Sequence, residues 1–191
     1  MQSEKFEENP SRTLAIDPGY DRLGWAVGEK DLARGPSRAA NARNDRVLEY
    51  GLITTKREED HYHRYWNIDE ELTAIVKKWQ PRWIVLEKLF LQKNQKTVMG
   101  VSEVRGVIMS VGFRHGLELV EFTPPQVKQA VTGYGRAEKG AVEKMVRLEL
   151  NLDPKVKIID DTIDALAILL TQLSSWRSEE GRGRRNNRRM E

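Results

Sequence analysis

The stretch TLAIDPGYDRLGWAVG, residues 13–28, predicts the beginning of a β-sheet. Residues 13–17 form a short apolar run that Pro18 and Gly19 end, which is typical of a buried strand followed by a turn. Residues 24–28 can return beside this run as a hairpin partner. Asp17 is the last residue of the first strand, so a carboxylate is expected where that strand ends.

The next segments extend this sheet. Residues 47–55 are rich in β-forming side chains and predict a third strand. From Tyr65 to Trp79 apolar residues recur at helical spacing, and Pro81 stops that helix before residues 83–87, a fully buried strand. A strand, a helix and a strand in succession form a crossover unit, which favours parallel pairing.

The second half predicts alternating helices and one more strand. A helix is expected over 97–115, a strand over 117–122, and a helix over 125–133 with Thr123 as its cap. Further helices are expected over 141–150 and from Asp160 or Asp161 through residue 173. The predicted fold class is α/β, with a mixed five-stranded sheet flanked by helices.

Length and composition limit the classes of protein that fit. A chain of 191 residues with 39% hydrophobic and 32% charged residues fits one soluble globular domain. No apolar run is long enough for a membrane span, and the polar, acidic leader lacks a signal core, so we expect a cytoplasmic protein. The chain contains no cysteine, which excludes disulfides and thiolate chemistry.

The charge is distributed unevenly along the chain. We expect a flexible leader over 1–12, one folded domain over 13–176 with a basic loop over 29–46, and a disordered basic tail over 177–191. Residues 181–191 hold five arginines against one glutamate, a net +4, and since the chain total is +3 the other 180 residues sum to −1. The tail is expected to seek polyanions, with a merely solubilising terminus as the alternative.

Four acidic residues stand in or beside apolar segments: Asp17, Glu87, Asp161 and Asp164. Ionised carboxylates in such places are costly unless a cation neutralises them. Asp17 and Glu87 end neighbouring predicted strands, and Asp161 and Asp164 share one face of a helix near its start. Carboxylate oxygens bind hard divalent ions such as magnesium, so the pattern favours a shared metal site that could hydrolyse a phosphodiester.

Each acid also has a structural interpretation. Asp161 could be a helix cap, a role for which Asp160 competes, and Asp17 could prepare the turn that follows it. Glu87 could pair with a nearby cation, and Asp164 could be a buried, hydrogen-bonded acid. The three histidines, His61, His63 and His115, are expected at the surface.

Five segments in order resemble the RuvC family of Holliday junction endonucleases. They span about residues 13–173: LAIDPGYDRLGWAV, IVLEKLFLQKN, EVRGVIM, EFTPPQVKQAVTGYGRAEKGAVEKMV and DDTIDALAILL. The resemblance implies a ribonuclease H-like fold, a homodimer, and paired symmetric nicks across four-way DNA junctions in recombination and repair. It also implies two Mg²⁺ ions per subunit, for which Mn²⁺ can substitute, and a branch-migration complex as a candidate partner.

By position, the resemblance implies that Asp17, Glu87, Asp161 and Asp164 are the catalytic metal ligands, with Asp161 rather than Asp160 matching the family acid. Phe90 matches an aromatic residue that stacks on bases near the crossover. Basic residues are expected to contact nucleic acid at four positions: Lys93, Arg105, Lys128 and Lys139. For Phe90 the structural alternative is a core residue, and for Lys128 and Lys139 it is an ordinary surface lysine.

Two features depart from the family pattern, and two other functions compete. Lys88 follows the strand acid where the family commonly has glutamine, and the 29–46 loop, the leader and the arginine tail are longer than the family core. One alternative is a YqgF-like ribonuclease H-fold enzyme that acts on RNA. The other is a junction-binding protein without activity, which would not need all four acids.

Overall fold

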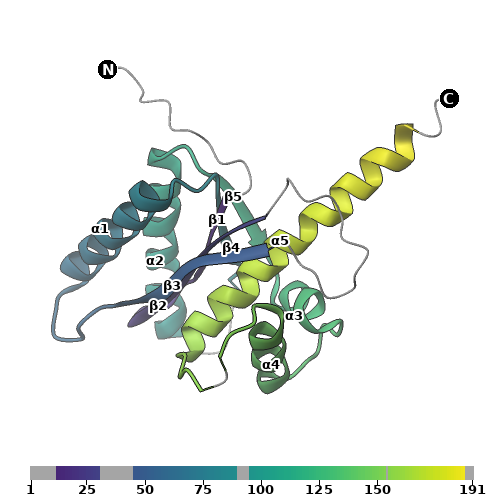
Figure 1. Cartoon of the computed structure of the whole chain (residues 1–191). Coiled ribbons are helices and arrows are strands. Elements are labelled where there is room, and N and C mark those ends of the chain that lie inside the picture. The colour runs from purple at the N-terminus through teal and green to yellow at the C-terminus, as the bar shows by residue number, and fades with distance from the viewer. Residues whose placement is uncertain (1–11, 31–44, 90–94, 154, 188–191) are drawn as a thin grey trace.

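A computed structural model describes residues 12–30, 45–89, 95–153 and 155–187 (Figure 1). Within these ranges the strands are β1 (Arg12–Asp17), β2 (Arg22–Lys30), β3 (Asp45–Thr54), β4 (Trp83–Glu87) and β5 (Glu118–Phe122). The helices are α1 (His61–Trp79), α2 (Gln95–Arg114), α3 (Pro124–Thr132), α4 (Lys139–Glu149) and α5 (Asp160–Asn187).

The five strands form one mixed sheet in the order β3-β2-β1-β4-β5. β1 pairs antiparallel with β2, and β2 antiparallel with β3, whereas β1–β4 and β4–β5 are parallel pairs. The carboxyl ends of β1, β4 and β5 therefore meet at one edge of the sheet, and their amino ends meet at the other.

Helices cover both faces of the sheet (Figure 1). On one face α1 and α2 pack over Leu14 and Ile16 of β1, and on the other α3, α4 and α5 pack over Ala15. This separation follows from the period-2 alternation of side chains along a strand. Two hydrophobic cores result, one on each side of the sheet.

The element predictions are largely confirmed, including the parallel crossover and Thr123 as the cap of α3, where it forms a capping box with Gln126. α1 begins at His61, before the apolar period that starts at Tyr65, because the side chain of Asp60 accepts from His63 N (3.0 Å) and caps the helix there. His115 is half-buried rather than at the surface.

The predicted boundaries of the basic loop and tail also need correction. β2 runs to Lys30 and β3 begins at Asp45, so the ends of the expected 29–46 loop belong to strands, and 31–44 lie outside the described residues. α5 continues to Asn187, so the backbone of 177–187 is helical where disorder was expected. Extending a helix that a buried segment has nucleated costs less than starting one. Residues 188–191 and the leader up to residue 11 lie outside the described ranges.

No helix in the described part of the chain is both long and apolar enough to cross a membrane.

Candidate active site

The four predicted carboxylates lie at one edge of the sheet. Asp17 ends β1 and Glu87 ends the adjacent parallel strand β4, whose Leu86 is level with Ile16. Asp161 lies in the first turn of α5, and Asp164 follows three residues later on the same helix. The parallel pairing predicted from the crossover is thus what brings the first two acids together.

A close approach between α5 and β2 delivers the other two acids. Gly24 is the register partner of Asp17, and a Cβ added to Gly24 would come within 1.9 Å of the carbonyl oxygen of Asp161. Only glycine leaves room for the helix to start there. Thr162 Oγ1 also donates to the carbonyl of Gly51 on β3 (3.1 Å), which fixes the same turn from the other side.

The electrostatics of Asp17 reflect this convergence. Burial, together with the charges of Asp164, Glu87 and Asp161, raises the pKa of Asp17 to about 7, with the charge of Lys139 opposing the increase. Asp17 is therefore within electrostatic reach of all three other acids.

Glu87 and Asp164 show the same pattern. Burial raises the pKa of Glu87, the charge of Asp164 adds to the increase, and the charge of Lys128 lowers it. Burial likewise raises the pKa of Asp164, and Lys139 opposes the increase. Half-buried acids that repel one another need a compensating cation or a proton.

Lys139, the first residue of α4, supplies part of this compensation. Its Nζ lies 3.2 Å from Asp164 Oδ2 and 3.4 Å from Asp160 Oδ2. Although burial lowers the pKa of Lys139, its contacts with Asp164 and Asp160 raise it overall. Lys139 therefore contacts Asp164, and the charge of Lys128 acts on Glu87.

Asp161 has an oxygen that no hydrogen bond satisfies. Arg22 Nε lies 3.1 Å from Asp161 Oδ2, yet the geometry is not that of a hydrogen bond, and this buried oxygen has no hydrogen-bond partner. A hard cation would satisfy such an oxygen. Among the residues that the structure describes, no three acidic or histidine side chains are already grouped as the ligands of one ion.

Arg105 does not lie where the sequence analysis placed it. Its side chain is only 7% exposed, donates to the carbonyl of Glu87 (2.5 Å) and pairs with Glu121 on β5. The expected contact of Arg105 with nucleic acid is therefore corrected, because the guanidinium is used inside the protein to hold the ends of β4 and β5. Phe90 and Lys93 lie outside the described residues.

Arg64, which the sequence analysis did not single out, holds the turn that follows Asp17. It is 4% exposed, donates to Asp21 Oδ1 (2.7 Å), to the carbonyl of Tyr20 (2.9 Å) and to Thr55 Oγ1 (2.9 Å), and its guanidinium lies 3.8 Å from the centre of the Tyr20 ring. An arginine in the first turn of an amphipathic helix is ordinarily exposed, so nothing in the sequence pattern marks it.

An open hollow of about 790 Å³ runs from the site along this turn. Its lining includes Asp161, Arg22 and Arg57, together with the end of β3 and the β1–β2 turn. Arg22 is paired with Asp161 and Arg57 with Asp21. Two arginines in a hollow beside a carboxylate cluster suit a polyanion that passes the acids.

Comparison with known proteins agrees with this geometry. The family model of crossover junction endodeoxyribonuclease RuvC matches residues 13–172. The chain is 42% identical over 154 residues to crossover junction endodeoxyribonuclease RuvC of Petrotoga mobilis, which covers 81% of this chain and 88% of that relative. It is 40% identical over 165 residues to the protein of the same name from Caldanaerobacter subterraneus, covering 86% and 93%.

Solved structures give the same result. The Thermus thermophilus RuvC structure matches with a TM-score of 0.77 at 27% identity, covering 88% of this chain and 96% of that one. The T. thermophilus RuvC complex with a Holliday junction substrate matches with a TM-score of 0.76. The yeast mitochondrial Holliday junction resolvase Ydc2 shares the fold, with a TM-score of 0.66 at 12% identity. The chain therefore belongs to the crossover junction endodeoxyribonuclease RuvC family, with its ribonuclease H-like fold.

Proposed function

We propose that this protein resolves four-way DNA junctions during recombination and repair by hydrolysing one phosphodiester in each of two strands, with Asp17, Glu87, Asp161 and Asp164 as the catalytic residues. The observation that carries the proposal is the convergence of these four acids at one sheet edge, in a chain of the RuvC family. The raised pKa values of Asp17, Glu87 and Asp164 and the unsatisfied Asp161 Oδ2 support a metal-binding role.

The residues present fit a divalent metal. All four are carboxylates, the donors that Mg²⁺ prefers and that Mn²⁺ also accepts. We propose Mg²⁺, two ions in each protomer. When bound, the ions would lower the pKa of an attacking water and stabilise the charge on the leaving oxygen. The protein's own part is to hold the carboxylates on two strand ends and one helix turn, where their supporting backbone is rigid.

Basic side chains around the acids would position the DNA. Lys128 acts electrostatically on Glu87, and Lys139 contacts Asp164, so both are close enough to bind phosphates on either side of the scissile one. Arg22 and Arg57 in the hollow would hold the continuing strand. Such contacts recognise the backbone and leave the base sequence unread. Stacking of Phe90 on bases at the crossover, and a contact by Lys93, stay predictions.

Two symmetric nicks require two active sites, and we propose that α2 forms the homodimer interface. Met99 and Phe113, 68% and 87% exposed, lie at the two ends of a stripe along α2 whose middle is small: Ser102, Gly106 and Ser110. A Cβ on Gly106 would meet nothing within 4 Å. Two other small residues of α2, Gly100 and Gly112, face Tyr20 and Ile84 inside the protein instead.

A panel of substrates tests the proposal against its two alternatives. The intact protein should nick an immobile four-way DNA junction and leave the matching linear duplex uncut. Cleavage confined to RNA-containing controls would favour the YqgF-like alternative, and tight junction binding without nicks under any divalent metal would favour the non-catalytic one. A cytoplasmic location and a branch-migration complex as partner stay predictions.

A further inference from the structure

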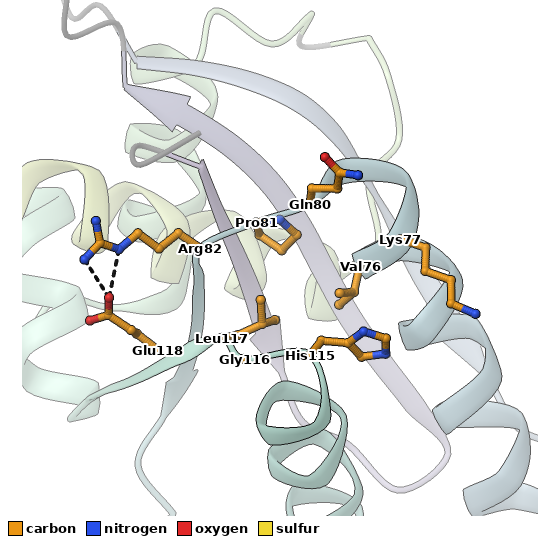
Figure 2. Close-up of a pocket in the computed structure, with 9 residues that line it drawn as sticks. All are labelled: Val76, Lys77, Gln80, Pro81, Arg82, His115, Gly116, Leu117 and Glu118. Atoms are coloured by element: carbon orange, nitrogen blue, oxygen red, sulfur yellow. Dashed lines mark hydrogen bonds and ion pairs between the residues drawn. The ribbon is translucent and has the colours of Figure 1, made fainter. Parts of the chain in front are cut away.

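A second hollow lies at the edge of the sheet away from the carboxylates. It has a volume of about 180 Å³ and lies between the end of α1, the residues that lead into β4, and the turn from α2 to β5 (Figure 2). Its lining comes from these three places: Val76, Lys77 and Gln80; Pro81 and Arg82; and His115 through Glu118. A ligand of drug size needs about 300 Å³ or more, so this volume suits one large side chain.

The hollow combines apolar side chains with positive charge at its edge. Val76, Pro81 and Leu117 supply the apolar part. Glu118 is neutralised by Arg82, whose Nη2 lies 2.7 Å from its Oε1 (Figure 2). Lys77 is exposed and has no ion pair with the residues that the structure describes. The side chain that fits best is therefore apolar and flanked by acidic groups.

The leader, residues 1–11, joins the folded domain next to this hollow. The carbonyl of Arg12 accepts a hydrogen bond from Arg82 N (3.0 Å), and Arg12 Nη1 donates to the carbonyl of Trp79 (2.6 Å). Arg12 is thus held between residues 79 and 82, on both sides of the α1–β4 connection that lines the hollow. Residues 1–11 continue from this point.

The composition of the leader matches the hollow. Phe6 is the only aromatic residue among residues 1–11, and the segment around it, Glu4-Lys5-Phe6-Glu7-Glu8, carries three acids against one lysine. Phe6 precedes Arg12 by six positions, a reach of up to about 20 Å for extended chain. Because the leader is tethered beside the hollow, its effective concentration is about millimolar, so even a weak contact would be occupied.

We propose that the hollow formed by α1, β4 and the α2–β5 turn is a docking site for the leader of the same chain, with Phe6 in the hollow and Glu4, Glu7 and Glu8 beside Lys77. The leader then belongs to the folded domain, at the sheet edge opposite the active site. Docking there does not alter the carboxylates, and junction cleavage by a Phe6→Ser variant should equal that of the parent protein.

Because the full chain contains no cysteine, a single nitroxide can test this docking. We would place the label on Asn9→Cys, which leaves both Phe6 and the hollow unchanged, and record the amide signals of residues 115–118. With Phe6 present, these signals should be attenuated at least about tenfold more than those of α4 on the opposite face of the sheet. Adding Phe6→Ser should restore them, and Lys77→Glu should restore them in part.

The Phe6→Ser comparison separates docking from mere tethering, since the leader starts near the hollow in either case. Equal attenuation with and without Phe6 would overturn the proposal, because it would show that Phe6 does not hold the leader in the hollow. A second sample mixes nitroxide-labelled protein without isotopes with isotope-enriched protein that carries no nitroxide. In this mixture, attenuation can arise only when the leader of one copy docks on another copy. Attenuation of the same size in that mixture would assign the hollow to the leader of a second copy, which also contradicts docking within one chain.

Discussion

Gly24 of β2 lies directly against the backbone of Asp161, so close that a methyl group at position 24 would come within 1.9 Å of the Asp161 carbonyl oxygen. This contact sets how near α5 comes to the strand beside Asp17, and with it the spacing between the acids of the helix and the acid of the strand. The geometry of the site therefore depends on a residue that has no side chain.

We predict that Gly24→Ala moves the start of α5 away from β2 and slows junction nicking by at least about 100-fold, because small displacements of catalytic groups have large kinetic effects. The free energy of unfolding should fall by about 1–3 kcal/mol. Gly140→Ala in α4 is the matched control, because a Cβ there meets nothing within 4 Å. Nicking by Gly24→Ala at the rate of the control would show that the close approach is not needed for the site.

Asp17 should make the metal-free protein less stable as pH rises. The folded-state pKa of Asp17 is raised from 3.8 to about 7, so between these values the folded protein binds more protons than the unfolded chain, and stability falls as pH increases through this window. Asp17→Asn cannot ionise. It should therefore raise the free energy of unfolding at pH 8 by about 1–3 kcal/mol and leave it nearly unchanged at pH 4.

Denaturant unfolding in EDTA at the two pH values measures this effect. Asp160→Asn is the control, because Asp160 is an exposed acid at the start of α5, close to the same cluster of carboxylates. A destabilised Asp17→Asn protein at pH 8 would mean that the carboxylate stabilises the metal-free fold, contrary to its crowded and buried position.

Lys139 should compete with metal for Asp164, since its Nζ lies 3.2 Å from Asp164 Oδ2. Lys139→Met removes an ammonium group that repels a divalent ion. Mn²⁺ measured by calorimetry should then bind about 3–10-fold more tightly, a change of about 1 kcal/mol. Nicking at saturating metal should nonetheless slow, because a phosphate contact is lost. Lys144→Met on the same helix should change neither quantity. Weaker Mn²⁺ binding by Lys139→Met would mean that the lysine orders the acids for the metal.

Arg105 and Lys128 should behave differently when the junction is titrated at several salt concentrations. Lys128→Met should weaken binding and reduce the slope of log K against log salt by about 0.9, the value for one phosphate contact. Arg105→Met should leave the slope unchanged and lower stability by about 3–5 kcal/mol, because it leaves Glu121 without its partner. A reduced slope of log K against log salt for Arg105→Met would show that Arg105 does contact nucleic acid, contrary to what its burial indicates.

The sequence predicted the fold and the four acids because both follow from local rules. Alternation and turn residues mark the strands, a crossover helix enforces parallel pairing, and the acids at Asp17 and Glu87 then meet. Asp164 stood out because it interrupts an apolar helical stripe.

What the sequence could not provide is the direction and burial of single side chains. Arg105 and Arg64 look like surface cations, yet both turn inward, to Glu121 and Asp21 respectively. The role of Gly24 depends on where α5 crosses the sheet, a tertiary relationship that spacing alone does not determine.

The most direct test of the account uses an immobile four-way junction, end-labelled on each strand in turn, with the protein and its Asp17→Asn variant in Mg²⁺ and in EDTA. We predict paired, symmetric, ligatable nicks by the unaltered protein in Mg²⁺ alone. We also predict no nicks by Asp17→Asn, although it should bind the junction with nearly equal affinity. Nicking by Asp17→Asn at the unaltered rate, or nicking in EDTA, would contradict a metal-dependent site built on these four carboxylates.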